Sequence, residues 1–135
     1  VCKSEDENLC HLICECSKIL PIWTSIEQLL SDVCNEDVIL STRDIIFGLR
    51  QDRFFSPIYS DVSNFIVLTA KWEIWKHRNN VKMEKAQILK SSDLFKRIVD
   101  ACKLHINLLM YSKKWEKINL ALRITLNNVN STEMV

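Results

Sequence analysis

The sequence predicts an all-α fold, in which a small bundle of about four helices follows a short Cys/His knuckle-like lobe. The chain has one Gly and two Pro in 135 residues, so tight turns that need positive φ are scarce. Apolar residues recur at spacings of three and four, which is typical of amphipathic helices. No stretch alternates apolar and polar residues as a half-buried strand does.

The length fits one domain, and we expect three segments within it. Residues 1–18 form a partial zinc-knuckle-like lobe, which holds four of the six Cys. Residues 19–126 form the helical domain. Residues 127–135 are polar and form a flexible tail.

The first helix is predicted over residues 19–34. Pro21 suits its first turn, where the missing N–H of Pro costs nothing. Trp23 flanks an apolar face with helical spacing. That face consists of Ile22, Ile26, Leu29, Leu30 and Val33.

A short second helix is predicted to begin at Ser41. Asp44 follows three residues later, so the pair resembles a capping box with Asp in place of Glu. Gly48 can end the helix. We expect the apolar residues here, and a Phe pair in the loop at 51–57, to pack into the core. These residues are Ile45, Ile46, Phe47, Leu49, Phe54 and Phe55.

The strongest helical pattern covers residues 61–78. Its apolar residues lie on more than one face, which predicts a central helix with neighbours on two sides. Asn79 and Asn80 are expected to break it. The apolar set is Val62, Phe65, Ile66, Leu68, Ala70, Trp72, Ile74 and Trp75.

The last long helix is predicted to be capped by Ser91 or Ser92, with Asp93 in its first turn. We expect it to continue, with a bend near Ser112, as far as Leu122. Its apolar stripe is Leu94, Ile98, Cys102, Ile106, Leu109 and Met110.

The spacing Cys2-x8-His11-x4-Cys16 predicts a zinc site, because thiolate and imidazole are the ligands that zinc prefers. In a Cys-x2-Cys opening the fourth ligand would lie three positions before Cys2, and because the sequence starts at Val1 we expect it either to be cut from a longer protein or to lack its true start. Cys10 or Cys14 can substitute for it. The competing interpretation is that these Cys are small buried hydrophobes.

Charge is uneven around the net value of +1. Residues 1–40 carry two Lys against eight acidic residues, and residues 41–135 carry 16 Lys/Arg against nine. Such asymmetry indicates a nucleic-acid surface, an acidic partner or a well-solvated helical surface. The candidate phosphate-binding residues are Lys71, Lys76, Arg78, Lys82, Lys85, Lys113, Lys114 and Lys117.

Trp72 and Trp75 interleave with these cations, and aromatic rings can stack on unpaired bases. The two indoles are three residues apart and share a helical face, so the preferred interpretation makes both of them core residues. His77 and His105 have no Cys or carboxylate at catalytic spacing, and we expect surface or hydrogen-bonded core positions for them. Two further thiols are expected to be buried. These are Cys34 and Cys102.

Known catalytic motifs are missing from the sequence: it has no P-loop, no Gly-x-Ser-x-Gly, no His-Glu-x-x-His and no paired carboxylate box. We therefore expect no enzyme activity and no small-molecule substrate. No signal peptide and no apolar run of about 18 residues is visible. We expect an intracellular protein without a membrane partner, with its Cys as free thiols or metal ligands.

Four blocks follow one another over most of residues 2–120. They are the Cys/His segment from Cys2 to Ser17 followed by Pro21-Ile22-Trp23, the block from Asp44 to Gly48, the block from Asn64 to Asn79, and Lys114-Trp115. In this order they resemble the C-terminal region of LINE-type (non-LTR) retrotransposon polyproteins. There a Cys-x2-Cys-x8-His-x4-Cys knuckle precedes a Trp and two helical blocks, and the first Cys of that pattern is the one this chain lacks.

The resemblance implies a non-catalytic module that lies C-terminal to endonuclease and reverse-transcriptase domains. It would help bind template RNA or target DNA during target-primed reverse transcription, in the nucleus, with the rest of the polyprotein as a partner. It also implies zinc as the cofactor, with Cys2, His11 and Cys16 as ligands and without Cys10 or Cys14.

Two other hypotheses remain open at this point. One is a helical protein-interaction or scaffold module that packs on the polymerase body without nucleic-acid binding of its own. The other is a domesticated remnant with a host role. Binding to single-stranded RNA that weakens steeply with salt would favour the nucleic-acid hypothesis.

Overall fold

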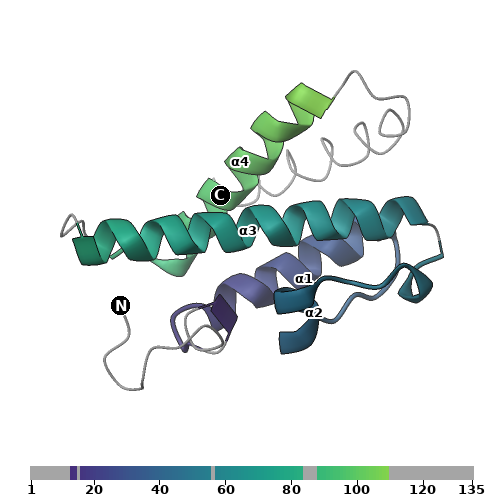
Figure 1. Cartoon of the computed structure of the whole chain (residues 1–135), viewed down its shortest axis with the longest axis horizontal. Helices are drawn as coiled ribbons and strands as arrows, with labels where there is room; N and C mark the ends of the chain where they lie inside the picture. Colours follow the sequence, from purple (N-terminus) through teal and green to yellow (C-terminus); the bar gives the residue numbers. More distant parts are fainter. Residues whose placement is uncertain (1–12, 15, 56, 84–87, 110–135) are drawn as a thin grey trace.

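The computed structural model describes residues 13–14, 16–55, 57–83 and 88–109, and these residues form an all-α fold without a strand. This confirms the predicted fold class. Figure 1 shows the longest helix crossing the whole view between the other helices. The elements are α1 (Leu20–Cys34), α2 (Thr42–Phe47), the 3-10 turn η2 (Gln51–Arg53), α3 (Pro57–Met83) and α4 (Ser91–Leu109).

Helix α1 begins and ends as its sequence predicts. Pro21 lies in the first turn, where no N–H is needed. The backbone carbonyl of Cys16 accepts hydrogen bonds from the N–H groups of Ile19 and Leu20, at 2.8 and 3.0 Å. Asn35 then adopts the left-handed conformation at φ 54° and closes the helix. The predicted apolar face of α1 is buried throughout.

Helix α2 carries the predicted capping box. The backbone N–H of Asp44 donates to the Ser41 hydroxyl at 3.1 Å, and the Ser41 N–H donates to the Asp44 carboxylate at 2.9 Å. Arg53 of η2 donates to the same carboxylate at 2.6 Å and to the Ile39 carbonyl at 2.8 Å. These bonds fix the short helix against the turn that follows it.

Helix α3 is the centre of the bundle, as the two-faced pattern predicts. It packs against α1, η2 and α4, and α1 also contacts α4. In Figure 1, α1 and α2 lie on one side of α3, and α4 crosses to the other. The prediction that Asn79 and Asn80 break the helix is wrong, because α3 continues to Met83. Asn disfavours a helix interior by less than about 1 kcal/mol per residue, which is too little to end a long helix by itself.

The core gathers the inward residues of the three long helices. Its largest fully buried side chains are Ile22, Ile26, Leu29, Leu30, Val62, Ile66, Val67, Ile74 and Ile98. The predicted buried thiols Cys34 and Cys102 are both confirmed in this core. Two of the residues predicted to pack into the core around the second helix and its loop are instead exposed: Phe47 is 81% exposed and Phe55 is 91% exposed. Phe47 is the last residue of α2, and Phe55 follows η2.

Part of the N-terminal segment joins the same core. Ile13, Cys14 and Cys16 are buried with the residues of α1, and the Trp23 indole N–H donates to the Ile13 carbonyl. The Ser91 hydroxyl donates to the Lys18 carbonyl at 3.2 Å, so Ser91 joins the first turn of α4 to the segment before α1. None of the helices in the described residues is long and apolar enough to cross a membrane.

Candidate nucleic-acid interface

Trp72 and Trp75 form an exposed pair of rings on α3. Their centroids are 5.2 Å apart and their planes meet at 21°, which is a stacked arrangement. Trp72 is 52% exposed and Trp75 is 43% exposed. The expectation that both tryptophans are core residues is therefore wrong. Ala70 and Ile74 are buried in this part of α3. The two indoles lie on another face of the helix.

A cation lies beside this stack. The Lys76 ammonium is 5.9 Å from the centroid of a Trp72 ring and 3.0 Å from the Glu73 carboxylate. A cation at this distance from an indole is attracted by the ring. The Lys76 side chain is 44% exposed, so its charge stays within reach of a ligand that approaches the rings.

Lys71 lies one residue before the stack, at the rim of a groove between α2 and α3. Its ammonium donates to the Ile46 carbonyl at 3.4 Å. The groove has a volume of about 380 Å³, and Phe47, Leu68 and Val67 contribute to its walls. Leu68 is 63% exposed, although it was predicted to pack with the apolar set of this helix. The exposed rings, Leu68 and Phe47 thus form one surface.

The groove is shaped by a close approach of Gly48 to Asn64. Gly48 has φ +98°, and a Cβ built on it would lie 3.3 Å from the Asn64 Oδ1. An L side chain rarely adopts this backbone conformation. Gly48 therefore lets the chain leave α2 and pass directly over α3.

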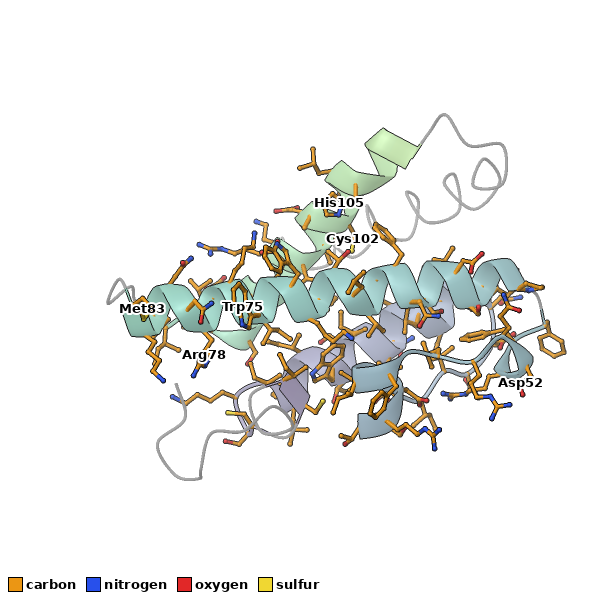
Figure 2. The ribbon with its side chains drawn as sticks, in the orientation of Figure 1. Asp52, Trp75, Arg78, Met83, Cys102 and His105 are labelled. Carbon is orange, nitrogen blue, oxygen red and sulfur yellow. The ribbon has the colours of Figure 1, made fainter. Side chains whose placement is uncertain are left out.

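Of the other predicted phosphate-binding cations, two lie on α3 and four lie outside the described residues. Arg78 is half-buried and donates to the Asn79 side chain at 3.2 Å, and Lys82 is exposed near the end of α3. Figure 2 shows Arg78 on the half of α3 that carries Trp75 and ends at Met83. The remaining four lie outside the described residues. These are Lys85, Lys113, Lys114 and Lys117.

The predicted zinc ligands are not brought together by the described part of the structure. Cys2 and His11 lie outside the described residues. Cys16 is buried. No cluster of three or more His, Cys, Asp or Glu is found among the described residues. The zinc site stays a prediction that rests on the spacing of its ligands.

Sequence reasoning missed two contributors to this surface, Phe47 and Leu68, because it assigned both to the core. The signal that could have indicated Phe47 is its position directly before Gly48, at the end of a helix of six residues. For Leu68 the signal is its register, since it lies four residues before Trp72 and seven before Trp75. Leu68 belongs to an apolar set that covers more than one face of α3. Each of these faces needs a neighbouring element or a ligand to cover it.

Comparison of the chain with known protein families, with characterised proteins and with solved structures gave no match.

Proposed function

We propose that this chain is a nucleic-acid-binding, non-catalytic module that holds a single-stranded segment of template RNA or target DNA for a retrotransposon reverse transcriptase. The observation that supports this function is the exposed Trp72–Trp75 stack with Lys71 and Lys76 beside it. Rings that stack on each other offer an outer face on which a base can continue the stack.

The energetics favour a single strand over a duplex. Stacking of a base on an aromatic side chain contributes about 1–3 kcal/mol and needs bases that are not already paired. Cations beside the rings attract the phosphates of the same strand. A binding surface with both features is tolerant of sequence, because every base has a π face.

A salt titration with fluorescent single-stranded RNA tests the proposal. Affinity is expected to fall steeply between about 50 and 200 mM salt, as counterions compete for the phosphates. Reversal of Lys76, Arg78 and Lys82 to Glu should weaken binding and flatten the salt dependence. Reversal of Lys18, Lys90 and Lys96, which are exposed elsewhere, changes the net charge equally and should have the smaller effect. Absence of binding at low salt would reject the proposal.

A second candidate function is a protein-interaction module, and one observation favours it. Leu68, Trp72 and Trp75 are exposed at positions i, i+4 and i+7 of one helix. Helices that dock into a groove of a partner protein present apolar anchors at this spacing. The partner here would be the polymerase body of the same polyprotein.

Leu68→Ala separates the two functions, because leucine has no ring on which a base can stack. If the surface binds a strand, Leu68→Ala should keep most of the affinity for RNA, whereas Trp72→Ala should lose it. If the surface binds a protein, Leu68→Ala should weaken the complex with the polymerase body as strongly as Trp72→Ala does.

Zinc belongs to the same proposal, with Cys2, His11 and Cys16 as its ligands. Thiolates and an imidazole suit zinc chemically. Elemental analysis of the purified chain and of Cys16→Ser tests this part. We expect zinc in the parent chain and its loss from the variant; equal zinc contents in the two would remove Cys16 from the ligand set.

A further inference from the structure

The groove between α2 and α3 is an open, largely apolar site next to the tryptophan stack. Ile46, Leu49 and Val67 line it together with the exposed side chains of Phe47 and Leu68, and its volume is about 380 Å³. A nucleobase is flat and apolar on both faces, so it can lie against the Phe47 ring. The ring is 81% exposed, which leaves it accessible from the solvent.

The charges at the rim favour an anionic ligand. Two cations line the groove, Arg50 and Lys71, and the described residues of its lining contribute no carboxylate. Arg50 forms an ion pair with Asp52 at 3.0 Å. Lys71 contacts only a carbonyl, that of Ile46 at 3.4 Å, so its charge has no carboxylate partner among the described residues. Lys71 is the cation that remains for a phosphate.

The groove and the tryptophan stack are continuous along α3. Leu68 lines the groove, and Trp72 lies one helical turn further on. From Leu68 to Trp75 the helix rises about 10 Å. A stacked strand rises about 3.4 Å per nucleotide. The combined surface is therefore long enough for about three nucleotides.

We propose that the α2–α3 groove binds a nucleotide of the strand whose neighbouring base stacks on the Trp72–Trp75 pair. Phe47 carries the base in the groove, and Lys71 binds the phosphate between the two sites. This inference rests on the proposed function and extends it to a second, separate contact on the same strand. It also assigns a ligand to the exposed ring of Phe47.

Binding of uridylates of two lengths tests the groove, because uridylate strands form little secondary structure. A single uridylate can occupy the stack alone, whereas a strand of about 12 nucleotides covers both contacts. We expect Phe47→Ala to weaken binding of the longer strand about tenfold and to leave that of the single uridylate nearly unchanged. Lys71→Gln should also weaken binding of the longer strand about tenfold. Trp72→Ala should weaken both lengths.

Matched controls are available on the same chain. Phe55→Ala removes another highly exposed ring that does not line the groove, and Lys96→Gln removes a cation exposed on α4. Both should bind both lengths as the parent chain does. Circular dichroism of each variant checks that the helices are retained, as expected for exposed positions.

The outcomes separate the two proposals. If Phe47→Ala binds the longer strand as well as the parent does, while Trp72→Ala loses binding, the groove proposal is overturned and the proposed function stands. If Trp72→Ala also binds as the parent does, the proposed function falls with it. If the parent binds neither strand at low salt, both are rejected, and an apolar protein segment becomes the better ligand for this surface.

Discussion

The side-chain amide of Asn64 makes two hydrogen bonds with the backbone of Leu49. Its oxygen accepts from the Leu49 N–H at 2.7 Å, and its nitrogen donates to the Leu49 carbonyl at 3.0 Å. A side chain from the middle of α3 thus satisfies both backbone groups of a residue that follows α2. This pairing fixes the segment after α2 to α3 beside the groove, which both residues line.

Replacement of Asn64 should destabilise the chain and disturb the groove. Asn64→Ala leaves the Leu49 N–H and carbonyl without partners, and we expect a loss of about 1–3 kcal/mol in the free energy of unfolding. Urea unfolding followed by circular dichroism measures it. Asn64→Asp is the matched variant, because it keeps an acceptor for the Leu49 N–H and places a carboxylate against the carbonyl. If both variants unfold at the same urea concentration as the parent, the two hydrogen bonds do not contribute to stability.

His77 should make stability depend on pH in the mildly acidic range. Its side chain is buried, and its Nε2 accepts a hydrogen bond from the Leu89 N–H at 3.3 Å. Burial, and secondarily the nearby charge of Arg97, lower the pKa of His77 below its usual value of about 6.5. The unfolded chain therefore binds a proton that the folded chain does not, and stability is lost as pH falls below about 6.5.

His77→Gln provides the control for this pH dependence. Glutamine can accept the Leu89 N–H without titrating, so the variant should lose the decrease in stability between about pH 7 and pH 5. Asp44 contributes at lower pH, because hydrogen bonds from Ser41 and Arg53 outweigh partial burial and lower the pKa of its carboxyl. Parallel stability curves for parent and variant across the mildly acidic range would contradict the assignment to His77.

Cys102 should resist alkylation until the chain unfolds. The residue is fully buried, and this burial raises the pKa of its thiol to about 12, with a smaller opposing contribution from the Thr69 hydroxyl. Only the thiolate reacts quickly, so the native chain should leave Cys102 unlabelled by iodoacetamide at about pH 8. Peptide mass mapping with and without guanidinium measures the alkylation of Cys102. Ser17→Cys supplies an exposed thiol as reference, and equal labelling of the two would contradict the burial.

Most of the fold could be predicted because helical periodicity and caps are local signals. The capping box of Ser41 and Asp44, the first-turn Pro21 and the apolar face of α1 were all found where expected. The end of α3 could not be predicted, because the weak helix preference of Asn79 and Asn80 is too small to end a helix by itself.

The surface was harder to predict than the fold, because periodicity shows which residues share a face but not whether a neighbour covers it. Trp72 and Trp75 carry the pattern of core residues, yet the buried residues of α3, among them Ile66 and Ile74, lie on other faces of this helix. The exposure of the two indoles depends on how the helices pack, which is not a local property of the sequence. The Cys/His spacing is the opposite case, since that prediction depends on sequence alone.

The tryptophans of this chain should differ sharply in their contribution to stability. Trp23 is 3% exposed and its indole N–H donates to the Ile13 carbonyl, so Trp23→Ala should lower the free energy of unfolding by about 3–5 kcal/mol. Trp72→Ala and Trp75→Ala remove exposed rings and their mutual stacking, and should each cost less than about 1.5 kcal/mol. Urea unfolding of the three variants measures the difference. A large loss from Trp72→Ala would mean that the ring has a structural role, and the variant could then no longer serve as a test of binding.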